Sequence, residues 1–174
     1  MKYLSCLFVV LLISCSSEQE KEGIEPYDGP VSVVKDVELL YSDSARVKIK
    51  LNAPLQEEFK NGNRIFNEGV HIAFFNEKGT VGSTIKGDQG KYNKKSNRYT
   101  VRGNVVVVNK EKEETLRTEE LFWKPKTGKI TTEKYVEIET DGELLTGNGL
   151  TANQDFSYYE ITRPKGIFSI ENDP

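Results

Sequence analysis

A 31-residue repeat between residues 85 and 140 limits the possible folds more than any other feature of the sequence. Segments 85–109 and 116–140 correspond at six positions, namely Ile85/Leu116, Tyr92/Trp123, Tyr99/Ile130, Val101/Thr132, Val105/Val136 and Val107/Ile138. A third, looser copy begins at Leu145 and carries about two extra residues in its last hairpin. A unit of this length cannot bury its own apolar face, so it stacks on its neighbours. The repeat therefore predicts a row of similar units around an apolar interior.

Each copy is typical of two strands joined by a polar turn. The predicted turns are residues 94–97, 125–128 and 153–155, and the second begins with Pro and ends with Gly. Outside the repeat, residues 46–51 alternate basic with apolar residues, which indicates a strand with one dry and one wet face. No stretch of ten or more residues has a helical period. These patterns predict an all-β domain.

Proline positions predict where strands are interrupted. Pro54 is expected to end the strand that precedes it, so that Ala53 to Phe66 forms an irregular connection with a helical turn near Gln56 to Phe59. Pro164 and Gly166 interrupt the last predicted strand, which favours an edge or end position for it.

The first residues are typical of a secretory signal rather than of a folded domain. Lys2 precedes an apolar run from Leu4 to Ile13, which is too short for a bilayer span of about 20 residues. Leu12-Ile13-Ser14-Cys15 resembles the lipobox of bacterial lipoproteins. This resemblance implies cleavage before Cys15, a diacylglycerol on its thiol and a further acyl chain such as palmitate on the new N-terminus. The alternative is an ordinary signal peptide with a Cys by chance.

The predicted organisation has three parts: a signal peptide at 1–14, a lipidated Cys15 with a flexible tether at 15–30, and a β domain at 31–174. Without residues 1–14 the chain keeps 23 basic residues against 27 acidic ones, so nucleic acid is not an expected partner. Cys6 leaves with the signal, so the β domain has no thiol, no disulfide and no Cys-based metal site.

Residues for catalysis are sparse, and we expect neither an enzyme nor a cofactor or metal site. His71 is the single histidine and lies in a predicted strand, where solvent exposure is the expected state. Glu113-Glu114 and Glu119-Glu120 are the densest carboxylates, and runs of this kind are usually solvated. The segment Gly147-Asn148-Gly149 is followed by no helix and no Lys-Ser/Thr pair, which argues against a phosphate loop.

Aromatic residues and glycines at strand ends have two interpretations each. The aromatic residues pack in the core or form a sugar-stacking platform, and the repeat favours the core: Tyr92, Tyr99, Trp123, Tyr158 and Tyr159. The glycines are expected to sit in β-bulges that curve the sheet: Gly87, Gly90, Gly103, Gly147 and Gly149.

Five segments stand out by their order and spacing, namely Glu68–Phe75, Gly87–Tyr92, Tyr99–Val108, Thr118–Ile130 and Gly147–Phe156. Together these segments resemble the LptC family of lipopolysaccharide export. The resemblance implies a twisted, slightly open β-jelly roll, or β-taco, whose two sheets enclose lipopolysaccharide acyl chains. It further implies receipt of lipid from the jelly roll of the ABC transporter subunits LptF and LptG, and transfer to the bridge protein LptA. Unpaired edge strands would make both contacts.

The inward-facing apolar row is the expected lipid lining, unless its members simply fill a dry core: Val47, Ile49, Leu51, Ile72, Phe74, Ile85, Tyr99, Val101, Val105, Val107, Ile130, Val136, Ile138 and Ile161. Two other functions remain open, a surface lipoprotein with a glycan- or protein-binding β-sandwich, and an LptA-like bridge. The lipid-transfer function predicts a hollow groove open at both ends. The β-sandwich predicts a solid core with exposed aromatic residues near Trp123 and Tyr159.

The leader departs from the familiar pattern of the family, which has an N-terminal membrane helix. A lipid on Cys15 would replace that helix and hold the domain at the periplasmic face of the inner membrane. Ser16 and Ser17 follow Cys15, so the simplest inner-membrane retention signal, an Asp, is missing. The outer membrane is therefore the alternative location.

Overall fold

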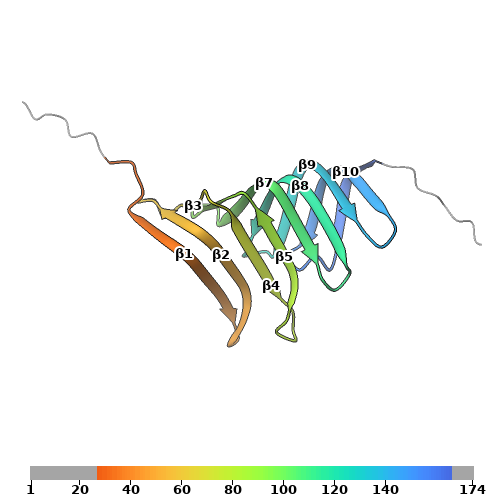
Figure 1. Ribbon diagram of the computed structural model, residues 1–174, viewed down its shortest axis with the longest axis horizontal. Helices are drawn as coiled ribbons and strands as arrows, with labels where there is room; N and C mark the ends of the chain where they lie inside the picture. Colours follow the sequence, from red (N-terminus) through yellow and green to blue (C-terminus); the bar gives the residue numbers. More distant parts are fainter. Residues whose placement is uncertain (1–26, 166–174) are drawn as a thin grey trace, which may run out of the picture.

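The computed structural model describes residues 27–165, and in this part of the chain alternating apolar and polar residues form strands (Figure 1). The all-β prediction is confirmed. The strands are β1 (Ser32–Asp43), β2 (Arg46–Glu58), β3 (Arg64–Phe66), β4 (Val70–Phe75), β5 (Val81–Gly87), β6 (Gln89–Asn93), β7 (Arg98–Asn109), β8 (Glu114–Lys124), β9 (Lys129–Glu139), β10 (Leu144–Asn153) and β11 (Tyr159–Lys165).

All 11 strands belong to one antiparallel sheet that follows the order of the chain. Both β3 and β4 pair with β2, and both β5 and β6 pair with β7. The strands β3 and β4 therefore act together as one interrupted strand, and so do β5 and β6. The sheet is therefore a meander from β1 at one edge to β11 at the other. Within residues 27–165, no helix is long and apolar enough to cross a membrane.

The pairing register reproduces the repeat seen in the sequence. Ile85 pairs with Val107 across β5 and β7, and the matching residues Leu116 and Ile138 pair across β8 and β9. The same holds at the other end of the unit, where Tyr99 pairs with Tyr92 as Ile130 pairs with Trp123. The predicted hairpin repeat is confirmed.

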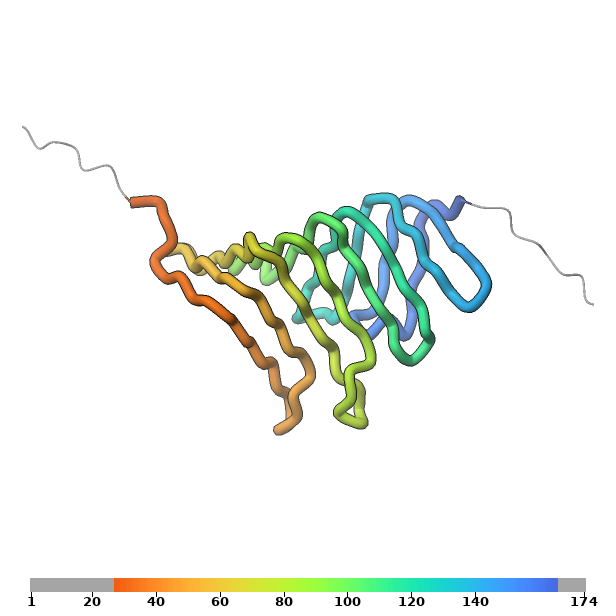
Figure 2. Tube along the Cα trace, in the orientation of Figure 1, coloured from red at the N-terminus to blue at the C-terminus, as the bar shows by residue number. Residues whose placement is uncertain are grey.

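Bulges and strand breaks form a line across the sheet, which we call the crease. Gly103 and Asn104 in β7 have positive φ angles of 73° and 45°, and the register with β8 shifts there. The backbone oxygen of Gly103 accepts a hydrogen bond of 3.0 Å from the amide of Asp88, which lies in the break between β5 and β6. Gly149 makes a similar bulge in β10, with a φ of 83°. The long strands bend over this line, so that their two halves form two layers (Figure 2).

Contacts between the layers show how far the sheet folds. The hydroxyl groups of Tyr41 in β1 and Tyr99 in β7 are hydrogen-bonded to each other. In a flat sheet these strands would lie about 19 Å apart, because four strand spacings of about 4.8 Å separate them. The core lies between the layers, where Trp123, Tyr99, Phe66 and Leu51 are among the largest fully buried side chains. This arrangement matches the expected β-taco.

Two predictions about special residues are corrected. Pro54 does not end its strand, and no helical turn forms after it, because β2 continues to Glu58 and pairs with β1 on both sides of Pro54. Its missing N–H removes no hydrogen bond to β3 or β4, since pairing with β4 ends at Asn52 and pairing with β3 begins at Glu57.

Of the five glycines expected in bulges, only Gly103 and Gly149 are at register shifts with positive φ. Gly87, Gly90 and Gly147 instead leave room for packing: a Cβ would come within 2.4 Å of Val101 at Gly87 and of Ile161 at Gly147, and within 3.1 Å of Phe66 at Gly90.

The predicted edge position of the last strand is confirmed for the described residues, because β11 ends the sheet beyond β10. Gly166, which was part of that prediction, lies outside the described residues. So do the predicted signal peptide, Cys15 and most of the tether.

Candidate functional site

An open groove of about 1050 Å³ lies between the rims of the two layers, and we call it the mouth groove. Tyr41, Ile49 and Phe74 give it an apolar floor. One wall comes from the ends of the β1–β2 and β4–β5 hairpins, and the other from Pro125 in the β8–β9 turn and from the loop between β10 and β11. Its volume lies just above the usual range for ligand sites, about 300–1,000 Å³.

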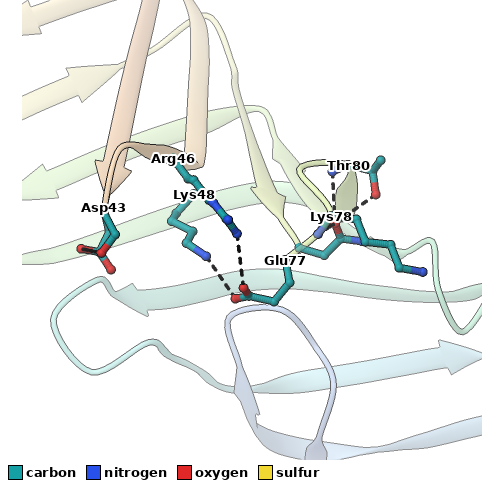
Figure 3. A network of polar contacts seen from close by, with 8 residues as sticks. Asp43, Arg46, Lys48, Glu77, Lys78 and Thr80 are labelled. Carbon is teal, nitrogen blue, oxygen red and sulfur yellow. Dashed lines mark hydrogen bonds and ion pairs between the residues drawn. The ribbon is translucent and has the colours of Figure 1, made fainter.

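A polar network holds two hairpin ends together at the rim of the mouth groove (Figure 3). Arg46 and Lys48 of β2 approach the carboxylate of Glu77 in the β4–β5 turn at 3.9 and 3.1 Å. Asn76 organises this turn, because its Oδ1 accepts hydrogen bonds of 3.1 Å from the amides of Lys78 and Thr80. The glutamate side chain is 85% exposed, so these ion pairs position the rim but add little stability.

Carboxylates outnumber cations on the lining of the mouth groove. Asp43, Glu77, Glu111 and Asp155 face two basic residues, Lys48 and Lys78. The electrostatic field of this lining does not attract an anionic group. Affinity for an anionic lipid would therefore have to come from its apolar chains.

Beneath the groove, a cluster of aromatic rings joins the layers. The rings of Tyr99 and Trp123 are stacked with centroids 5.0 Å apart, and Phe74 meets Trp123 edge-on at 5.3 Å. Tyr92 adds a tilted contact with Tyr99 at 4.7 Å. Burial, and next the hydrogen bond with Tyr41, raise the pKa of Tyr99 far above its usual value. Its hydroxyl is therefore neutral at physiological pH.

This cluster decides between the two interpretations of the aromatic residues. Trp123 is 0% and Tyr99 is 2% exposed, so both belong to the core, as the repeat predicted. Tyr92 and Tyr159 pack against the core, and of the five aromatic residues considered in the sequence only Tyr158 is largely exposed, at 61%. The rings do not form a sugar-stacking platform.

The structure brings the predicted lining residues together between the layers. All of them except Val47 and Ile161 belong to the buried core. Val47 is 37% exposed near the free end of the β1–β2 hairpin, and Ile161 is partly buried because its edge strand has a neighbour on one side. Ile49 and Phe74 also line the mouth groove. Their contact with lipid stays a prediction.

The interior is more densely filled than an open trough. The core side chains pack on one another across the layers, which is the solid core expected of a β-sandwich. The mouth groove offers about 1050 Å³ of open volume, and smaller pockets of about 450 and 400 Å³ lie beside Val70 and beside Tyr135. The hollow groove expected of a lipid carrier is thus present on one rim, and side chains occupy the rest of the interior.

Several inner-face residues were not predicted from the sequence. Phe66 falls in the segment expected to be irregular, and Leu121 changes face because the register between β8 and β9 shifts after Thr118. Phe156 is 3% exposed although it lies in a loop. An apolar residue in a polar loop was the available signal for this last one.

Other candidate residues are peripheral, as expected. His71 lies on the outer face of β4, where its imidazole reaches solvent but is partly desolvated by its neighbours. This desolvation, and next the charges of Lys86 and Lys110, lower the pKa of the imidazole. No group of three or more His, Cys, Asp or Glu residues able to hold a metal ion occurs within residues 27–165. Glu113 and Glu119 are exposed, as predicted for these carboxylate runs, whereas Glu114 and Glu120 are partly buried. Glu114 accepts a hydrogen bond from the Tyr159 hydroxyl, and Glu120 pairs with Arg102.

A family model described as "Lipopolysaccharide-assembly, LptC-related" matches residues 3–162, which is most of the chain. No curated protein matches the sequence. The matched range includes every described strand except the last residues of β11.

Proposed function

Because the chain belongs to the LptC family and so has a role in lipopolysaccharide transport, we propose that it takes lipopolysaccharide from the jelly roll of an inner-membrane ABC transporter, formed by LptF and LptG, and passes it to an LptA bridge. Members of this family are transport components and not enzymes. The single observation that carries the proposal is the mouth groove of about 1050 Å³, whose apolar floor opens between two layers of one sheet.

Acyl chains would enter the mouth groove and lie on its floor. Each buried methylene contributes about 0.8 kcal/mol, so several chains can hold the lipid without charge attraction. The carboxylates on the lining oppose the phosphate groups of the lipid. The headgroup therefore stays outside while the chains contact Tyr41, Ile49 and Phe74.

The two edges of the sheet support contacts with neighbouring jelly rolls. Within residues 27–165, β1 pairs only with β2, and β11 pairs only with β10. β1 has 12 residues and carries exposed apolar side chains, among them Val33 and Leu40. A long edge of this kind is suited to strand addition. The tether from Cys15 leads into β1, so we assign β1 to the transporter and β11 to the bridge.

The membrane anchor is part of the same proposal. A lipid on Cys15 would hold the domain at the periplasmic face of the inner membrane, with the outer membrane as the alternative. Mass spectrometry of the mature N-terminus tests the anchor, and an unmodified Cys15 would contradict it. Separation of the two membranes then locates the protein.

Site-specific photo-crosslinking in cells tests the cargo. A benzophenone side chain replaces Tyr41 on the groove floor, Ile138 deep in the core, or exposed Lys95 as the control. We expect lipopolysaccharide to be captured at position 41, and at position 138 if the chains reach that depth. If the folded protein captures lipopolysaccharide at neither position, the proposed transport function is wrong.

Crosslinking from the edges tests the partners separately from the cargo. A crosslinker at Val33 in β1 is expected to capture the transporter, and one at Glu160 in β11 the bridge protein. If both edges capture the same protein, or if neither captures a protein, strand addition as assigned here is wrong, even where position 41 still captures lipid.

A further inference from the structure

The loop of residues 154–158, between β10 and β11, places an aromatic side chain inside the protein, and we call it the plug loop. Phe156 is 3% exposed, although its neighbours Asp155, Ser157 and Tyr158 are exposed. Its φ is 55°, in the left-handed region that bulky residues rarely adopt. The surrounding contacts must therefore hold the phenyl ring in place.

Three buried donors anchor the plug loop, and they come from three different strands. The Ser83 hydroxyl in β5 donates to the backbone oxygen of Gln154 at 3.3 Å, and Asn109 Nδ2 in β7 donates to that of Phe156 at 3.0 Å. Trp123 Nε1 in β8 donates to Gln154 Oε1 at 3.2 Å. A buried donor that loses its partner is strongly unfavourable. These hydrogen bonds therefore favour the return of the loop whenever it moves away from the three donors.

The plug loop separates two spaces. Its outer side, at Gln154, Asp155 and Ser157, forms part of the wall of the mouth groove. On its inner side the phenyl ring of Phe156 shares a residual cavity of about 10 Å³ with Val107, Leu116, Ile138 and Tyr159, among others. This cavity is barely large enough for one water molecule. The ring thus fills an apolar position that would otherwise extend the groove towards β11.

We propose that the plug loop is displaceable, and that Phe156 occupies the position of a segment of a saturated acyl chain. When the loop swings out, the mouth groove extends past Trp123 towards Ile138 and the β11 edge. An acyl chain replaces the phenyl ring, and the three donors draw the loop back once the chain has moved on. This inference rests on the proposed function, since it specifies the path of the same cargo.

Trp123 fluorescence can detect the entry of an acyl chain beside the plug loop, because Trp123 is the only tryptophan of the chain and is hydrogen-bonded to this loop. Bromine atoms on an acyl chain quench indole fluorescence only at contact distance. The full chain in detergent is mixed rapidly with 9,10-dibromostearic acid, and the rate of quenching is recorded. Unbrominated stearic acid is the control for changes in emission without contact.

Two variants in the plug loop form a matched pair. Phe156→Gly removes the ring and suits the positive φ, whereas Tyr158→Gly removes a ring that is 61% exposed in the same loop. We expect Phe156→Gly to accelerate quenching at least tenfold and Tyr158→Gly to match the wild type. Ser83→Ala, which removes one anchor with little change of shape, is expected to accelerate it severalfold and serves if Phe156→Gly does not fold. Equal rates in all folded variants would overturn the inference.

Capture of lipopolysaccharide at position 41 separates this inference from the proposed function. If position 41 captures the lipid while the plug-loop variants leave the quenching rate unchanged, the proposed displacement of the plug loop is wrong and the transport proposal stands. If position 41 captures none, the transport proposal fails, and the quenching rates still decide whether the loop opens to an acyl chain.

Discussion

Tyr41 and Tyr99 are expected to respond unequally to loss of a hydroxyl, although they share one hydrogen bond. Tyr99 is 2% exposed, and Tyr41 is the only hydrogen-bond partner of its hydroxyl group within residues 27–165. Tyr41 lies on the floor of the mouth groove and is only partly buried. Water can therefore replace the lost partner of Tyr41 but not that of Tyr99.

This difference in exposure determines how much each substitution should lower the free energy of unfolding. Tyr41→Phe leaves the buried hydroxyl of Tyr99 unpaired, which should lower the free energy of unfolding by about 1–3 kcal/mol. Tyr99→Phe leaves a hydroxyl that water can reach, so the decrease should be about 0.5–1.5 kcal/mol. The double variant removes both polar groups and should be no less stable than Tyr41→Phe alone.

Urea unfolding followed by circular dichroism measures all four proteins. With a urea dependence of about 2 kcal/mol per molar, a decrease of about 2 kcal/mol moves the midpoint by about 1 M. Equal slopes in the four proteins show that the comparison is valid. A larger decrease for Tyr99→Phe than for Tyr41→Phe would refute the reasoning, and so would strict additivity of the two changes.

Three further predictions concern pH, the β11 edge and the rim. Burial raises the pKa of Tyr99 above the usual 10.0, so above pH 10 the folded state keeps a proton that the unfolded state loses. The free energy of unfolding, measured by urea titration, should therefore fall as the pH rises above 10, and it should fall less in Tyr99→Phe. Gly147→Ala puts a Cβ 2.6 Å from the backbone oxygen of Arg163 and should loosen β11 in hydrogen exchange, whereas Gly82→Ala, with 3.6 Å to its nearest atoms, should not. Glu77→Gln should leave the urea midpoint unchanged within error at high salt, since exposed ion pairs are screened; a clear decrease there would contradict this.

Local patterns in the sequence were sufficient to predict most of the strands and the hairpin pairing within the repeat. The 31-residue offset pairs Leu116 with Ile138 as it pairs Ile85 with Val107, because a two-residue period leaves one register that buries the apolar row. Strand breaks were harder to predict. Pro54 is harmless where β2 has no neighbour on one side, and this depends on where β3 and β4 end.

The apolar interior was predictable in its residues, but the mouth groove was not: Ile49 and Phe74 of its floor were predicted from the sequence, and Tyr41 was not. Nearly all residues of the predicted lining face the space between the layers, because alternation determines which face of a strand is apolar. How open that space is depends on the crease, where bulges at Gly103 and Gly149 come into line through pairing between distant segments. Phe156 was missed because its burial follows from anchors in three other strands.

The sequence by itself determined an all-β chain of repeated hairpins with one apolar face, since strand periodicity and repeat spacing are local properties. Only the tertiary structure decided that this sheet bends along a crease, that aromatic rings join the layers beneath a mouth groove, and that a loop residue fills the interior. These features arise from contacts between residues far apart in the chain. Tyr41 and Tyr99, 58 positions apart, meet only because the sheet folds onto itself.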